Sequence, residues 1–186
     1  MTDEDRALHL GCVTAAIMQS VAALEADIWD VLNHGPGHHL GSNVVDASAR
    51  ELLLPAAEAI DRQELLTRYS LVLHLLGRQP MDPGAEPWQG AALLVRLRNE
   101  ITHYKSRWGS KRNQEKFFTT LQTKIRRPPS FVPDLGVNFF PLQCLSAERA
   151  AWAVETTDAY ISVFYVALGI RSPLMPRSPK EFSPRT

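Results

Sequence analysis

An arginine, an amide and a histidine lie close together near the middle of this chain, in a run of residues that favours a helix. Arg98 and Asn99 precede His103 in the stretch Leu97-Arg98-Asn99-Glu100-Ile101-Thr102-His103-Tyr104. Histidine can give or take a proton near neutral pH. Arginine offers a planar fork of donors to a phosphate and to the charge that grows on it. These residue types predict phosphodiester cleavage, in which His103 transfers a proton and Arg98 holds the phosphate.

The spacing of these residues restricts how they can act together. Because successive residues of a helix turn by about 100°, Arg98 and His103 lie about 140° apart around the axis and roughly 7.5 Å along it. One regular helix cannot easily aim both at one atom. Asn99 and His103 share a face, so Asn99 can orient the imidazole. The spacing therefore predicts a distorted helix or a site completed by a second copy of the chain.

Positive charge is concentrated directly around and after this stretch. The 186 residues have a formal net charge of zero, but residues 1–95 carry −8 and residues 96–127 carry +8. Such asymmetry predicts an anionic partner for the basic segment, which holds half of the positive charge. The alternative is that this segment pairs with the acidic helices of the same chain.

Within the basic segment, aromatic and cationic side chains are interleaved. Aromatic rings can stack on bases, and cations can hold backbone phosphates. For the two aromatic residues, a place in the core or in an interface is an equal alternative. The candidate RNA-binding residues are Tyr104, Lys105, Arg107, Trp108, Lys111 and Arg112.

The pattern of an arginine, a polar residue, three further residues and a histidine on a helix resembles the signature of the HEPN superfamily. Here it is carried by Arg98, Asn99 and His103. The resemblance implies a small all-helical protein. It also implies a metal-independent ribonuclease that dimerises so that two motifs line one cleft. Some HEPN toxins paired with a nucleotidyltransferase antitoxin carry a tyrosine two residues after the histidine. This chain has Lys105 there and its tyrosine at position 104, so regulation through that tyrosine is not expected.

Three functions are compatible with these observations. The first is an endoribonuclease that cleaves single-stranded RNA through its 2′-OH, as a cytoplasmic homodimer in a toxin or antiviral defence system. Its partner would be an antitoxin or a nucleotidyltransferase. The second is a non-catalytic HEPN-like module that binds RNA or a protein, and the third is a helical structural protein. The presence of Arg98, Asn99 and His103 together favours the enzyme, because a binding module needs no histidine there.

The elements that must position this motif are helices. Apolar residues recur at steps of three and four over about residues 4–32, 46–77, 88–108 and 147–168, and residues 113–125 form a further, basic helix. Pro87 suits the start of the helix that carries the motif. Residues 126–145 are proline-rich and irregular, with a short strand expected at 137–140. We therefore expect an all-α bundle of about five helices over residues 1–170, followed by a disordered proline-rich tail at 171–186.

Metal and membrane sites are not expected. His34, His38 and His39 lie in a glycine-rich loop, but among nearby carboxylates only Asp46 is evident, so we expect no metal and no cofactor. Cys12 and Cys144 are expected to be reduced core thiols. The acidic N-terminus lacks the features of a signal peptide. No apolar stretch is expected to reach the roughly 18 residues of a membrane span.

Overall fold

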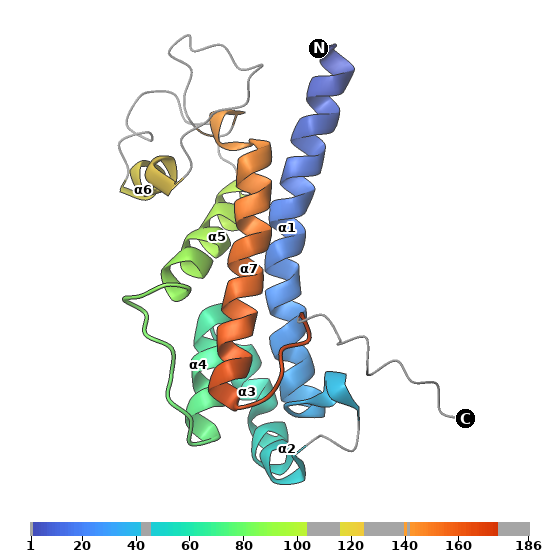
Figure 1. The fold of residues 1–186 in the computed structure, drawn as a ribbon, viewed down its shortest axis with the longest axis vertical. Helices are drawn as coiled ribbons and strands as arrows, with labels where there is room; N and C mark the ends of the chain where they lie inside the picture. Colours follow the sequence, from blue (N-terminus) through green and yellow to red (C-terminus); the bar gives the residue numbers. More distant parts are fainter. Residues whose placement is uncertain (1, 42–45, 104–115, 125–139, 141, 175–186) are drawn as a thin grey trace, which may run out of the picture. The chain divides into compact units, whose positions relative to one another are not determined.

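The described residues of the chain form helices and no strand. The computed structural model describes residues 2–41, 46–103, 116–124, 140 and 142–174. Its α-helices are α1 (Asp3–His34), α2 (Ala47–Leu53), α3 (Ala57–Asp61), α4 (Leu65–Leu75), α5 (Trp88–Thr102), α6 (Lys116–Lys124) and α7 (Ala147–Leu168). Short 3-10 turns lie at His38–Leu40, Leu54–Ala56 and Leu142–Cys144. The all-α prediction is confirmed (Figure 1).

The chain divides into two compact units, and each is discontinuous in sequence. The first unit consists of residues 1–24 and 83–157, and the second consists of residues 25–82 and 158–186. Both α1 and α7 therefore contribute residues to each unit. The single domain expected for residues 1–170 stays a prediction. Only residues 171–174 of the expected disordered tail and residue 140 of the expected strand at 137–140 lie within the described residues.

In the first unit, the early part of α1 packs with α5 and with the first half of α7. Val13, Ile17 and Val21 are buried on α1, as the apolar spacing predicts. The Thr157 hydroxyl of α7 donates a hydrogen bond to the backbone carbonyl of Ser20 at 3.2 Å. At the start of α5, a Cβ on Gly90 would lie 3.2 Å from a Thr156 methyl carbon, so a larger residue would crowd this contact.

A buried arginine anchors the start of α7 within the same unit. Arg149 is 1% exposed, and its guanidinium donates to the backbone carbonyls of Leu121 at 2.9 Å and Cys144 at 3.3 Å. The Leu121 carbonyl belongs to the last turn of α6, whose carbonyls have no partner within the helix. Arg149 thus joins α6 to α7. Along α7, Ala153 is fully buried, whereas the neighbouring Val154 is 48% exposed.

In the second unit, the end of α1 packs with α4 and with the second half of α7. Tyr69 contacts Tyr160 and Phe164 edge to face, with ring centroids 5.0 and 4.7 Å apart. Leu24 ends the α1 stripe of the first unit, and Ile28 and Val31 continue the buried stripe in the second. The aromatic rings thus form the centre of this unit's core.

The second predicted helical region is divided into three helices. Asp46 caps α2, because its carboxylate accepts from the backbone N–H groups of Ser48 and Ala49 at 3.0 and 3.2 Å. Pro55 lies in the 3-10 turn that separates α2 from α3. Glu64 adopts an extended backbone with ψ 143° and separates α3 from α4. Asp46 is thus the N-cap of α2.

Two expectations about individual residues and segments are corrected. Cys12 is exposed, whereas Cys144 is buried, and both are free thiols. Burial raises the pKa of the Cys144 thiol to about 12. α1 is long and apolar enough to cross a membrane by length and composition alone, contrary to the sequence expectation. Core helices of soluble proteins meet the same criterion, and α1 buries the stripe that contains Ile17 and Val21.

Candidate functional site

The motif residues lie at the C-terminal end of α5, in the first unit. Arg98 and Asn99 are within the helix, and His103 follows its last residue. The backbone N–H of His103 donates to the carbonyl of Asn99 at 2.9 Å. This bond extends the helical pattern to His103, although its backbone, at φ −107° and ψ 33°, has left the helical region. A helix that begins at Trp88 and carries Arg98 and Asn99 is confirmed, but it ends at Thr102, directly before His103 and short of the predicted residue 108.

The three motif side chains differ in their exposure. Asn99 and His103 are exposed, whereas Arg98 is half-buried. Within the described part of the chain, no hydrogen bond joins the side chains of Asn99 and His103. The orientation of the imidazole by Asn99 therefore stays a prediction. A substrate can reach the exposed imidazole at the helix end from solvent. The half-buried Arg98 side chain can adopt fewer conformations than an exposed one.

The residues around the motif come from α1 and α6. The Thr102 hydroxyl donates to the Arg98 backbone carbonyl at 2.9 Å and approaches the Met18 sulfur at 3.7 Å. Two residues before the motif, the Arg96 guanidinium lies 4.4 Å from the centre of the Phe117 ring. This is a cation–π distance. This contact joins α5 to α6.

The six side chains predicted to bind RNA lie outside the described residues. They all belong to the segment 104–115, between α5 and α6. Their contribution remains an expectation from charge and residue type. They are Tyr104, Lys105, Arg107, Trp108, Lys111 and Arg112.

A buried carboxylate in the second unit was missed by the sequence analysis. The hydroxyls of Tyr69 and Tyr165 donate to the two oxygens of Asp27, each at 3.1 Å. Burial raises the pKa of Asp27 to about 6, although the two hydroxyl donors oppose this and the nearby Asp30 carboxylate adds to it. Asp27 follows Leu24 by three residues, so it lies next to the apolar stripe of α1. That position was the available signal for a buried carboxylate.

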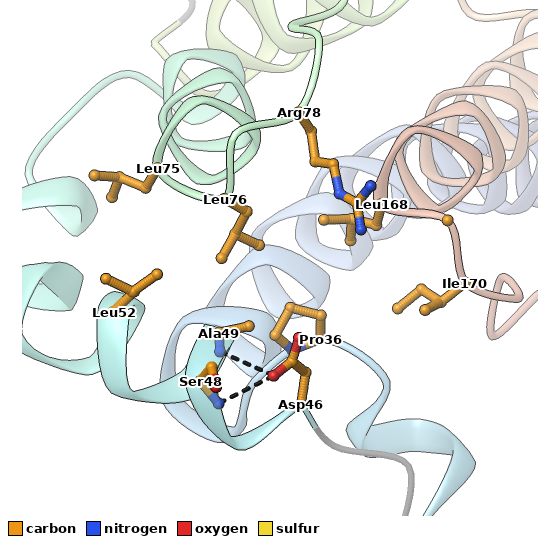
Figure 2. Close-up of a pocket in the computed structure, with 11 residues that line it drawn as sticks. Pro36, Asp46, Ser48, Ala49, Leu52, Leu75, Leu76, Arg78, Leu168 and Ile170 are labelled. Carbon is orange, nitrogen blue, oxygen red and sulfur yellow. Dashed lines mark hydrogen bonds between the residues drawn. The ribbon is translucent and has the colours of Figure 1, made fainter.

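A small cavity in the second unit lies between the turn after α1, the start of α2 and the ends of α4 and α7 (Figure 2). Its volume is about 370 Å³, within the range of small-molecule sites. The lining is mostly apolar. Asp46 lies at one side, but its carboxylate is already occupied as the α2 cap, and Arg78 lies at another. The cavity therefore presents one cationic group and no assembled catalytic group.

The second unit also contains a group of potential metal ligands. Asp30 and His34 of α1 and His38 of the following turn each offer a ligand atom, and these atoms lie within 4.8 Å of one another. His34 and His38 were visible in the sequence as candidate ligands, whereas Asp30, four residues before His34, was not predicted as one. His39 is held elsewhere, since its Nε2 is 2.8 Å from the carbonyl of Arg171 and its ring packs against Tyr165.

Comparison of the chain with protein-family models, with curated proteins and with solved structures gives no match.

Proposed function

We propose that this protein is a metal-independent endoribonuclease of HEPN type. The observation that carries the proposal is the position of Arg98 and Asn99 in the last two turns of α5 and of His103 directly after the helix, with the imidazole exposed to solvent. The excess of positive charge that begins there adds support. Residues 96–127 contain 10 Lys or Arg against 2 Asp or Glu, which suits an anionic polymer.

In this proposal the RNA supplies its own nucleophile. The 2′-OH attacks the adjacent phosphorus, the bond to the 5′-oxygen breaks, and a 2′,3′-cyclic phosphate remains. His103 removes the proton of the 2′-OH or protonates the leaving 5′-oxygen. Arg98 donates hydrogen bonds to the phosphate as negative charge grows on its oxygens. Asn99 orients the ring of His103, and no metal-activated water is needed.

We propose a homodimer because Arg98 and His103 of one chain cannot easily reach the same phosphate. Arg98 and His103 are five residues apart on the same helix end, on well-separated faces. An isologous two-fold contact near the end of α5 would place two histidines and two arginines in one cleft. One histidine would then act as base and the other as acid. The proposed setting is a cytoplasmic toxin or antiviral system, with an antitoxin or nucleotidyltransferase as partner.

The test is cleavage of a mixed single-stranded RNA pool by purified protein in EDTA. Wild type should cut RNA, leave cyclic phosphate ends and spare DNA, which lacks the 2′-OH. His103→Ala should remove activity, and Arg98→Lys should lower it about a hundredfold, because lysine lacks the planar fork. The matched control is His74→Ala. His74 is likewise an exposed histidine near a helix end, that of α4.

Two results would contradict the proposal. Equal activity of wild type and His103→Ala would mean that another site or a contaminant cleaves the RNA. No cleavage, together with RNA affinity that falls steeply with salt, would identify the non-catalytic binding module instead. In that case Lys111→Glu combined with Arg112→Glu should weaken RNA binding, while His103→Ala should leave it unchanged.

A further inference from the structure

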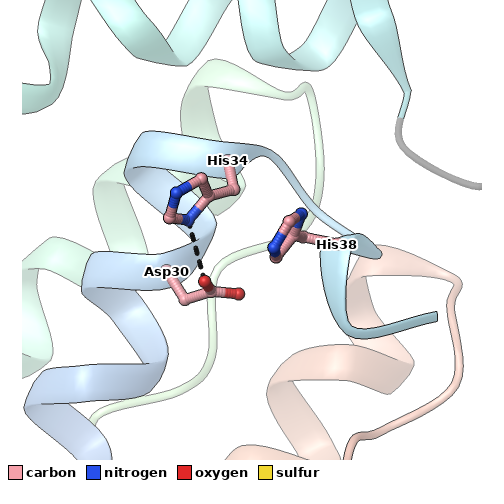
Figure 3. A group of neighbouring side chains, drawn as sticks. All are labelled: Asp30, His34 and His38. Carbon is pink, nitrogen blue, oxygen red and sulfur yellow. Dashed lines mark hydrogen bonds and ion pairs between the residues drawn. The ribbon is translucent and has the colours of Figure 1, made fainter. Parts of the chain in front are cut away.

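Three side chains with metal-binding atoms converge at the end of α1, in the second unit. Figure 3 shows Asp30 and His34 on the last turns of the helix and His38 on the turn that follows. His34 Nδ1 lies 2.8 Å from Oδ1 of Asp30. The rings of His34 and His38 are stacked, with centroids 4.5 Å apart. One oxygen and two nitrogens thus lie within 4.8 Å of one another.

The local sequence explains why these side chains meet. Asp30 and His34 are four residues apart on a helix, so they project from the same face. Gly35 and Gly37 adopt φ values of 90° and 87°, which side chains other than glycine rarely allow. With Pro36 between them, they reverse the chain and return His38 toward His34. The Gly35–Pro36–Gly37 turn therefore places His38 next to Asp30 and His34 of α1.

The electrostatic surroundings favour a cation at this point. The carbonyl end of a helix carries partial negative charge, and α1 ends at His34. The Asp27 carboxyl, one turn before Asp30, interacts unfavourably with it. The rings of Trp29 and His34 pack edge to face, with centroids 5.6 Å apart. A bound cation would relieve the repulsion between the carboxylates.

We propose that Asp30, His34 and His38 form a binding site for zinc. Two imidazole nitrogens and one carboxylate oxygen form a ligand set typical of Zn²⁺ sites, with a fourth position left for water or an outside ligand. The two His rings are stacked with their planes only 22° apart, so nitrogen lone pairs, which lie in the ring planes, do not converge on one point in this arrangement. Zinc binding therefore requires His38 to rotate, and its exposed side chain has room to do so. The ion would fasten the turn at 35–38 to the end of α1.

The experiment is a titration of untagged protein with Zn²⁺ by calorimetry and with Co²⁺ by visible absorption. A Cys12→Ser background removes the exposed thiol as a competing ligand. Wild type should bind one ion per chain, and Co²⁺ should show the d–d bands of a low-coordinate site. His34→Gln, His38→Gln and Asp30→Asn should each weaken binding about tenfold or more. His74→Gln is the matched control and should bind like wild type.

A replacement ligand distinguishes a lost site from a disturbed fold. His38→Cys should retain Zn²⁺ binding and should add a thiolate-to-Co²⁺ charge-transfer band, because cysteine is itself a zinc ligand. Zinc affinity of His38→Gln equal to that of wild type would overturn the proposal, as would binding of Mg²⁺ as tightly as Zn²⁺. The proposed RNA cleavage is measured in EDTA, so failure of either proposal leaves the other intact.

Discussion

The hydroxyl of Tyr69 donates a hydrogen bond to Oδ2 of Asp27 at 3.1 Å, so an aromatic residue of α4 holds a buried carboxylate of α1. Tyr165 of α7 holds the other oxygen at the same distance. Three helix segments of the second unit thus meet at one titratable group. The pKa of that group, raised by burial to about 6, makes the stability of the protein depend on pH.

Asp27→Asn should become progressively more stable than wild type as the pH rises from about 4 to about 7. The native state holds the Asp27 proton up to about pH 6, whereas an unfolded carboxyl releases it near 3.8. Unfolding therefore releases a proton in this window, and rising pH favours the unfolded wild type. The gain should approach about 3 kcal/mol. Urea denaturation across the window measures it, with the exposed Asp158→Asn as control. A constant difference between Asp27→Asn and wild type would contradict the raised pKa.

Tyr69→Phe and Tyr165→Phe should each destabilise the fold more near pH 7 than near pH 4. Each removes one donor to Asp27, and a hydrogen bond to an ionised carboxylate is stronger than one to a neutral carboxyl. We expect a loss of about 1–3 kcal/mol near neutral pH. A double-mutant cycle with Asp27→Asn measures the coupling. Equal losses with and without the Asp27 carboxylate would show that the hydroxyls act elsewhere.

Arg149→Met should lower the free energy of unfolding by roughly 2–5 kcal/mol. The substitution keeps an apolar side chain of similar length but leaves the carbonyls of Leu121 and Cys144 without their donors. Burial already lowers the pKa of Arg149 to about 10, so the folded state bears the cost of a buried charge. Thermal and urea melts provide the measurement, with the exposed Arg50→Met as the control. A melt unchanged from wild type would mean that these carbonyls find other partners.

Asp46→Ala should lower the free energy of unfolding by about 1 kcal/mol, the usual effect of removing a helix cap. The Asp46 carboxylate satisfies two backbone N–H groups in the first turn of α2. Asp46→Asn should recover most of the loss, because an amide oxygen can also accept these bonds. Amide hydrogen exchange of Ser48 and Ala49 provides a local readout. Unaltered exchange in Asp46→Ala would exclude the capping role.

His103→Ala should change the free energy of unfolding by less than about 0.5 kcal/mol, whereas Arg98→Ala should cost about 1 kcal/mol. The His103 side chain is exposed, but that of Arg98 is half-buried and its aliphatic stem contributes packing. Melting curves of both variants test the difference. If His103→Ala proved strongly destabilised, its loss of RNA cleavage would no longer identify a chemical role.

Helices with long apolar stripes were predictable from the sequence. The range predicted for α7, residues 147–168, agrees with its observed bounds, and α1 differs by one or two residues at each end. The division of residues 46–77 into three helices was not predicted. Pro55 lies at the first break, but the second, at Glu64, has no glycine or proline to mark it.

Buried polar residues account for the other differences. Sequence reasoning treats an arginine as a surface residue, so it gave no reason to expect Arg149 among the buried residues of α7. Asp27 was overlooked because the tyrosines that donate to its carboxylate come from helices distant in sequence. For the motif, the helix that carries Arg98 and Asn99 was predictable from the sequence. The half-buried state of Arg98 depends on packing within its unit, which spacing alone does not reveal.

The interleaving of the two units has a consequence for synthesis of the chain. Residues 1–24 are made before residues 83–157, which complete their unit. Residues 25–82 are likewise made before residues 158–186. Neither unit can finish folding before α7 emerges from the ribosome, so the apolar stripe of α1 stays incompletely covered until then. Ribosome-bound chains that end before α7 should therefore depend on chaperones more than the released protein does.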